Sequence, residues 1–164
     1  MSEIERTRTY DWESPLDTAS KARTLTGLEF LNGMLNGEIA VPPIAKTLDF
    51  HLLSIEKGKI LAEFTPYEFH YNPIGTVHGG VISTVLDTVM GCALHSGLPQ
   101  GVAYTTLELK VNFVKAVTIR SGKLLVEGRI INVGRTTALL EAEVKSEGGT
   151  LYAHATSTCM IFKP

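Results

Sequence analysis

HYNPIGTVHGGVISTVLDTVMGCAL, residues 70–94, joins a turn-rich loop to an apolar segment and decides the fold of this chain. From Val81 to Leu94 the apolar residues continue for about four helical turns, whereas a typical strand has roughly 5 to 6 residues. Helical spacing gathers the small and polar residues on one narrow stripe and leaves the rest of the circumference apolar. The segment is therefore predicted to be a buried helix. Its stripe is made of Gly80, Ser83, Thr84, Asp87 and Gly91.

Asp87 is the only charged residue in this predicted helix. A carboxylate that is buried without a partner is unstable in its charged form, so Asp87 must have a partner or a function. One interpretation is structural, with Asp87 as a cap or half of a polar pair. The other is catalytic, because Asp87 lies about two turns from a glycine-opened helix start, where backbone N–H groups and a partial positive charge are exposed. Carboxylate and N–H donors could then act on one small substrate group.

The composition predicts one domain and argues against nucleic acid as a partner. The chain has 164 residues, of which 44% are hydrophobic, enough for a single core. Its net charge is −2 at pH 7, and no basic cluster of the kind that binds nucleic acid stands out.

We expect a cytoplasmic protein that does not enter a membrane. No charged segment leads into an apolar one at the N-terminus, so no signal peptide is predicted. The longest apolar stretch, residues 77–98, is interrupted by two histidines and an aspartate and is a poor membrane span. Cys92 and Cys159 lie far apart without metal-ligand spacing, which predicts buried thiols in a reducing compartment and no metal site.

Residues 1–40 are predicted to form a loose arm and one amphipathic helix, outside a core domain at residues 41–164. Up to residue 16 the chain is polar and unperiodic, and Trp12 is expected to dock on the rest of the molecule. From Asp17 onward apolar residues recur at helical spacing, which predicts a surface helix that covers a sheet edge or one end of the core. Residues 41–44 contain two consecutive prolines and are predicted to be a turn or an extended connector.

The remaining segments read as strands of an antiparallel sheet. Residues 106–113 alternate most clearly: the odd-numbered ones, from Leu107 to Phe113, are predicted to face the core, and the even-numbered ones, from Thr106, to face water. Short turns containing glycine predict that neighbouring strands are antiparallel. The other predicted strands are Thr47–Ile55, Lys59–Thr65, Lys123–Val133, Thr136–Ser146 and Thr150–Phe162. A curved sheet would bury most of the long helix and leave its small-residue stripe for self-association.

Asn72, Gly75, His78-Gly79-Gly80 and Asp87, followed by TLELKVNF at residues 106–113, resemble the hotdog-fold acyl-CoA thioesterases, specifically the PaaI-like phenylacetate-degradation branch. The similarity runs from about residue 44 to residue 162. It implies an α+β hotdog fold, in which an antiparallel curved sheet is wrapped around one long buried helix, here with an N-terminal helical extension.

The resemblance also implies a homodimer in which each active site forms between the loop of one subunit and the helix of the other. The backbone N–H of Gly79 would hold the thioester oxygen. Asn72 and His78 would orient the substrate carbonyl or the attacking water. Asp87, contributed by the partner chain, would be the nucleophile or the general base.

Thr106 matches a Ser or Thr that helps to place the water in some family members, and Thr105 would take its place if the loop length differed by one residue. Arg135 and Lys115 could contact the phosphates of coenzyme A, with solvated surface charges as the alternative interpretation. The residues expected to bind substrate are Gly75, Gly80, Ser83 and Arg135.

The predicted function is hydrolysis of acyl-CoA thioesters of small, medium-chain or aromatic acids by a dimer or a homotetramer, built as a dimer of dimers. No cofactor is expected, because coenzyme A is part of the substrate. A hydratase of acyl thioesters and a non-catalytic acyl-CoA sensor are the alternatives on the same fold. His78 could also be a simple helix cap. A Ser83–His78–Asp87 triad is disfavoured, because Ser83 and Asp87 lie one turn apart on one helix and His78 precedes it.

Overall fold

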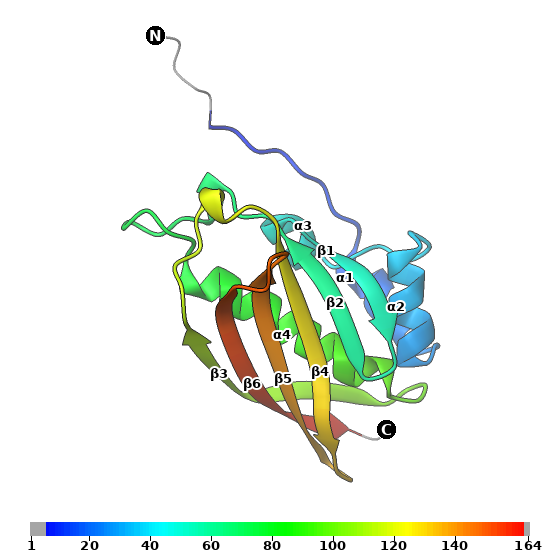
Figure 1. Ribbon diagram of the computed structural model, residues 1–164. Helices are drawn as coiled ribbons and strands as arrows, with labels where there is room; N and C mark the ends of the chain where they lie inside the picture. The colour runs from blue at the N-terminus through cyan, green and yellow to red at the C-terminus, as the bar shows by residue number, and fades with distance from the viewer. Residues whose placement is uncertain (1–5, 163–164) are drawn as a thin grey trace.

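The computed structural model describes residues 6–162, and in it a curved antiparallel sheet wraps around one long helix (Figure 1). Within these residues six strands form the sheet, in the order β1-β2-β4-β5-β6-β3. The helices are α1 (Pro15–Ala22), α2 (Gly27–Leu35), α3 (Pro43–Leu48) and α4 (Gly79–Ser96), with short 3-10 helices η1 (Glu68–His70) and η2 (Ile119–Ser121). The strands are β1 (Phe50–Glu56), β2 (Lys59–Phe64), β3 (Ala103–Phe113), β4 (Leu124–Val133), β5 (Thr137–Ser146) and β6 (Leu151–Phe162). The predicted hotdog fold, with its N-terminal helical extension, is confirmed.

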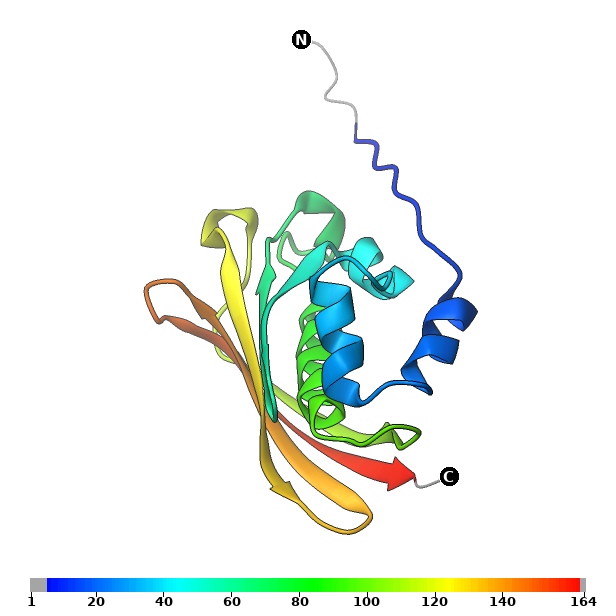
Figure 2. The same ribbon diagram turned by 90° about the vertical axis from the view of Figure 1, so that its right-hand side faces the viewer.

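The long helix α4 lies between the inner face of the sheet and helix α2 (Figure 2). Most of its apolar residues are buried, Leu86 and Val89 fully, which confirms the prediction of a buried helix, and Val81 and Cys92 are half-buried. The sheet approaches α4 most closely at Gly128 on β4. A Cβ atom at this position would lie 2.7 Å from the backbone carbonyl of Val89, so only glycine fits there without a shift.

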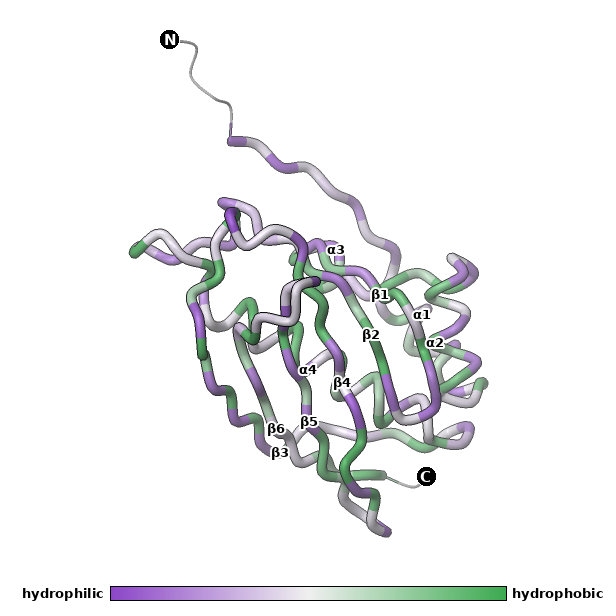
Figure 3. The backbone as a smooth tube through the Cα atoms, viewed as in Figure 1, coloured by the Kyte–Doolittle hydropathy of each residue, from purple (hydrophilic) through white to green (hydrophobic). Residues whose placement is uncertain are grey.

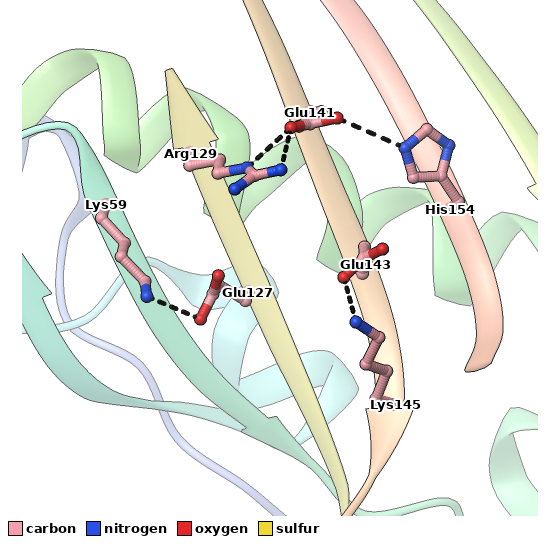
Figure 4. Close-up of polar contacts among 7 residues, drawn as sticks. All are labelled: Lys59, Glu127, Arg129, Glu141, Glu143, Lys145 and His154. Atoms are coloured by element: carbon pink, nitrogen blue, oxygen red, sulfur yellow. Dashed lines mark hydrogen bonds and ion pairs between the residues drawn. The ribbon is translucent and has the colours of Figure 1, made fainter. Parts of the chain in front are cut away.

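The opposite face of the sheet is polar and carries ion pairs (Figure 4). Arg129 on β4 contacts Glu141 on β5, and His154 on β6 lies 3.5 Å from the same carboxylate. Lys59 and Glu127 form a further pair at 2.9 Å. Hydrophilic and hydrophobic residues accordingly alternate along these strands (Figure 3). The predicted antiparallel pairing of β1 with β2, of β4 with β5 and of β5 with β6 is confirmed.

The predicted alternation along β3 is wrong at its start, because the strand contains a β-bulge. Thr106 and Glu108 pair with consecutive residues of β6, so Leu107 is the extra residue. An extra residue reverses the inside–outside order, and Thr106 therefore points toward α4 and not toward water. Leu107, predicted to face the core, is 55% exposed as the bulged residue. Phe113, also predicted to face the core, is 57% exposed at the far end of β3, which the bulge does not explain.

The single amphipathic helix predicted from Asp17 onward is two helices, α1 and α2. The chain breaks between them because Thr26 caps α2. The Thr26 side chain accepts the backbone N–H of Glu29, and the Glu29 carboxylate accepts the backbone N–H of Thr26. The pattern of this capping box, a threonine followed three residues later by a glutamate, is visible in the sequence.

The prediction of an extended connector at residues 41–44 is wrong from Pro43 onward, because Pro43 begins helix α3. Proline is tolerated in the first helical turn, where its missing N–H would have had no helical acceptor. Strand β1 consequently begins at Phe50 and not at Thr47. The N-terminal arm docks on α3 through Arg8, which donates to the backbone carbonyl of Thr47, whereas Trp12 is 59% exposed.

Candidate active site

Asp87 on α4 accepts a hydrogen bond from the hydroxyl of Thr106 on β3. The distance from Thr106 Oγ1 to Asp87 Oδ1 is 2.9 Å. Asp87 is half-buried and forms no ion pair within residues 6–162. A carboxylate held by one hydroxyl keeps its second oxygen available to accept a proton or to attack an electrophile, as a general base or a nucleophile requires.

The bulge at Leu107 explains why Thr106 reaches this carboxylate. Bulges often re-aim a side chain beside a functional site. Thr105 is exposed and donates no hydrogen bond to Asp87 in the part of the chain that the structure describes. Of the two candidates for this position, the geometry therefore favours Thr106.

A cavity of about 570 Å³ opens beside Asp87 and Thr106, and we call it the Asp87 cavity. Its size lies within the range of small-molecule sites, about 300–1,000 Å³. One wall is made by helices α1, α2 and α3, which contribute Ala19, Phe30 and Met34 among other apolar residues. The sequence predicted only that the N-terminal helical region covers a sheet edge or one end of the core. Contacts between elements that are distant in the sequence produce no local residue pattern, so the cavity wall was not predicted.

The thiols near Asp87 are not nucleophiles at neutral pH. Burial, with the nearby charge of Asp87, raises the pKa of Cys92 to about 12. Burial also raises the pKa of Cys159, whose sulfur lies 3.9 Å from the Thr106 hydroxyl. Both cysteines are unbridged, and both stay protonated.

Asn72 and Gly75 shape the loop that precedes α4. The Asn72 side-chain oxygen accepts the backbone N–H groups of Ile74 at 3.0 Å and Thr76 at 3.2 Å. Its amide nitrogen donates one hydrogen to the Thr76 hydroxyl, at 3.0 Å, which leaves one N–H for a ligand. Gly75 has a φ of +81°, a left-handed conformation that favours glycine.

His78 is the N-cap residue of α4. Its Nδ1 atom accepts the backbone N–H of Gly80 at 2.8 Å, which is the structural role considered above as an alternative for this residue. The backbone N–H of Gly79 has no hydrogen-bond partner within residues 6–162. It is therefore an available donor at the positive end of an 18-residue helix.

A second cavity, of about 280 Å³, lies at this helix start, and we call it the Gly79 cavity. Asn72 and Gly79 line it, together with Phe113 and Lys115 from the end of β3 and the segment after it. The Lys115 ammonium lies 5.3 Å from the centre of the Tyr152 ring. A cation, an amide and a helix N-terminus are thus gathered at one place.

The predicted catalytic residues form two separate groups within one chain. Gly79 and Asp87 are eight residues apart, about 12 Å along the axis of α4. They also line different cavities, with Asn72 beside Gly79 and Thr106 beside Asp87. A single chain does not bring the two groups together.

Three residues predicted to bind substrate, Ser83, Gly80 and Arg135, are either bonded within α4 or lie outside the two cavities. The Ser83 hydroxyl donates to the backbone carbonyl of Gly79, at 2.9 Å within its own helix. Gly80 is exposed at the start of α4, and its N–H is taken by His78. Arg135 is exposed in the turn between β4 and β5, outside both cavities.

Within residues 6–162, no group of three His, Cys, Asp or Glu side chains is arranged to hold a metal ion. None of the helices in the described range is long and apolar enough to cross a membrane.

Residues 74–153 match the thioesterase superfamily. A protein of Saccharolobus solfataricus that carries the name "putative esterase" is 31% identical over 121 residues, which cover 73% of this chain and 84% of that protein.

Two solved structures are similar in fold and in sequence. A phenylacetic acid degradation-related protein from Ralstonia eutropha JMP134 is 30% identical, with a TM-score of 0.72, over 79% of this chain and 97% of its own. A protein from Streptococcus mutans UA159, solved with bound acetyl-CoA, is also 30% identical, with a TM-score of 0.63, over 69% of this chain and 88% of its own.

Proposed function

Because this chain belongs to the thioesterase superfamily and is a PaaI-like thioester hydrolase, we propose that it hydrolyses acyl-CoA thioesters of small, medium-chain or aromatic acids. Coenzyme A would arrive as part of the substrate, without a further cofactor. The Streptococcus mutans structure with bound acetyl-CoA supports this choice of thiol. The mostly apolar lining of the Asp87 cavity supports an acyl group as its occupant.

The observation that carries the proposal is the carboxylate of Asp87, held by the Thr106 hydroxyl at 2.9 Å beside an apolar cavity. A hydrolase needs a group that activates water or attacks the carbonyl carbon. In the part of the chain that the structure describes, Asp87 is the only carboxylate that lines this cavity.

Hydrolysis breaks the carbon–sulfur bond and adds an oxygen atom from water to the acyl carbon. As a general base, Asp87 would take a proton from water while the water attacks the thioester. As a nucleophile, it would attack the carbon itself, expel the coenzyme A thiolate and then be released from the mixed anhydride by water. Both routes place negative charge on the thioester oxygen, which the N–H of Gly79 would stabilise.

The site would be completed by a second copy of the chain. The Gly79 group and the Asp87 group lie about 12 Å apart along α4, too far to act on one thioester. Strand β3 is an edge of the sheet, and apolar side chains are exposed on it at Leu107 and Phe113 and directly after it at Val114. An exposed edge with apolar side chains favours pairing with another chain. We therefore place the Gly79 group of one subunit beside Asp87 of its partner.

The same proposal includes a dimer of dimers and a cytoplasmic location. The two unbridged cysteines, Cys92 and Cys159, agree with a reducing compartment.

Release of free coenzyme A from a panel of acyl-CoAs tests the function. Acetyl-, octanoyl- and phenylacetyl-CoA represent the three acyl classes, and release from at least one of them is expected. Tight binding without release would indicate a sensor and contradict the proposal. Hydration of an enoyl-CoA would indicate a hydratase, although His78, the histidine expected to serve it, caps α4.

Replacement of Thr106 with valine is expected to lower kcat by about tenfold or more, because a hydrogen bond to a charged group contributes about 1.5–3 kcal/mol. KM should change little, since Thr106 acts through Asp87. Thr106→Ser keeps the hydroxyl and should retain most of the activity. Steady-state kinetics of the three proteins checks this, and equal kcat for the valine and serine variants would contradict the positioning role.

A further inference from the structure

His70 is a buried histidine outside the two cavities, and it joins three elements of the fold. Only 2% of the residue is exposed. Its ring packs on Phe64 of β2, at 5.0 Å between ring centres, and on Phe69 of η1, at 4.2 Å. Nδ1 lies 3.0 Å from the backbone nitrogen of Tyr67, and Nε2 lies 2.9 Å from the carbonyl oxygen of Leu48 at the end of α3. A buried ring with both nitrogens bonded holds these elements in one arrangement.

The two hydrogen bonds require a neutral ring in a single tautomer. The backbone N–H of Tyr67 can only donate, and the carbonyl oxygen of Leu48 can only accept. Nδ1 is therefore the acceptor, and Nε2 carries the proton. A second proton, on Nδ1, would set two N–H groups against each other and break the bond to Tyr67. Burial lowers the pKa of His70 below its ordinary value of 6.5; the bond to Leu48 and the charge of Asp49 oppose this shift, and the charge of Arg8 adds to it.

The backbone of His70 closes the loop that leads into α4. Its carbonyl oxygen accepts the N–H of His78 at 2.8 Å, and His78 is the N-cap residue directly before Gly79. Within this closed loop Tyr71 forms a β-bridge with Val77. The position of the Gly79 N–H therefore depends on where His70 is held.

The N-terminal arm supports His70 from the side of α3. Arg8 donates to the carbonyl oxygens of Lys46 and Thr47, and His70 donates to the next one along the chain. These are the last three carbonyls of α3, which a helix end leaves without partners of its own. The Arg8 guanidinium also lies 4.1 Å from the centre of the Phe69 ring. Helix α3 is thereby fastened to η1 and to the loop that follows it.

We propose that His70 is a positioning residue, which holds the loop before α4 so that the Gly79 N–H meets the thioester oxygen. The inference rests on the proposed function, because it takes Gly79 as the donor that stabilises this oxygen. Such a donor works only in a narrow range of positions, and a misplacement of about 1 Å can cost about 10²-fold in rate. The loop should be held while the ring is neutral and released as the pH falls through the lowered pKa of His70.

His70→Phe keeps the aromatic packing and removes both hydrogen bonds. It is expected to lower kcat for acyl-CoA hydrolysis by about tenfold or more, with little change in KM, because Gly79 acts mainly in the transition state. His70→Gln can still donate to Leu48 but does not titrate, so it should retain more activity and keep it to a lower pH than the wild-type protein. Equal kcat for the wild-type protein and His70→Phe, or loss of activity at the same acid pH in His70→Gln and the wild-type protein, would overturn the proposal.

Arg8→Met should move the loss of activity at acid pH in the opposite direction. Without the nearby positive charge His70 takes up a proton at a higher pH, so kcat should fall at a higher pH than in the wild-type protein. Asp49, and Glu68 on η1, are unchanged in this variant. His154→Gln, on the outer face of the sheet (Figure 4), is the matched control and should leave the pH profile unchanged. Identical profiles for Arg8→Met and the wild-type protein would overturn the role of His70.

Hydrogen exchange separates this proposal from the proposed function. The protection factor of the His78 N–H reports whether the loop is closed, without any turnover. It should fall in the wild-type protein as the pH is lowered from about 7 to about 5, and it should stay constant in His70→Gln. That result supports the positioning role even if the wild-type protein releases no coenzyme A, which would defeat hydrolysis alone. The same pH dependence in both proteins would overturn the positioning role even if every thioester is hydrolysed.

Discussion

Asp87→Asn is expected to lower kcat for acyl-CoA hydrolysis by about 10³-fold, within the range of about 10²–10⁴ that a positioned acid–base group contributes. The amide has nearly the shape of the carboxylate and still accepts the Thr106 hydrogen bond, so the fold and the oligomer should persist. It cannot take a proton from water or attack a thioester, so both proposed routes fail. Release of free coenzyme A under saturating substrate measures the loss.

Glu141→Gln is the matched control for this experiment. Like Asp87, Glu141 is a carboxylate on a regular element and has polar neighbours. It belongs to β5 and lies on the outer face of the sheet, beside Arg129 and His154. Its replacement should leave kcat near the wild-type value. An Asp87→Asn protein that retains near-normal turnover would remove Asp87 from the mechanism.

Gly128→Ala is expected to lower the free energy of unfolding by about 3 kcal/mol, the upper part of the usual range for overpacking a core. The added methyl group would lie 2.7 Å from backbone atoms of Val89. A side chain could relieve such a clash by changing its rotamer, but the backbone of a buried helix cannot. The helix and the sheet would have to separate. Urea unfolding, followed by circular dichroism, measures the change.

Gly148→Ala provides the comparison, because the nearest atom to a Cβ at that position is the Ser146 hydroxyl oxygen, at 3.8 Å. Its unfolding midpoint should stay close to that of the wild-type protein. Equal midpoints for Gly128→Ala and Gly148→Ala would show that the contact between β4 and α4 is looser than described.

The sequence was sufficient to predict α4 and the sheet, because both depend on local patterns. An apolar segment of this length has few alternatives to a buried helix, and short glycine turns determine which strands are neighbours. The orientation of Thr106 could not be predicted, because a single bulge residue, Leu107, changes which side chains face inward without altering composition. The prolines at residues 42 and 43 do not exclude α3, because proline disfavours a helix interior but not a helix start.

The cavity could not be predicted for a different reason. Its walls combine α1, α2 and α3 with α4 and two strands, so its residues are spread from Pro15 to Thr106. Nothing in the spacing of Phe30 or Met34 distinguishes a residue that lines a cavity from one that only covers the core. Asp87 itself was identifiable, because a carboxylate in an apolar helix is unusual wherever the helix packs.

Hybrid dimers test most directly the proposal that one active site takes its N–H donor from one chain and its carboxylate from another. Gly79→Pro removes the donor at the first position of α4, where proline is compatible with a helix, and Asp87→Asn removes the carboxylate. Each variant alone should be nearly inactive. Co-expression with two different affinity tags allows the hybrid dimer to be purified.

A shared site leaves the hybrid dimer with one intact site, made from the unaltered Gly79 of one subunit and the unaltered Asp87 of the other, because a two-fold dimer has two equivalent sites. The kcat per dimer should then recover to about half of the wild-type value. If both groups came from the same chain, every site in the hybrid would carry one defect. A hybrid as inactive as its two parents would contradict the account.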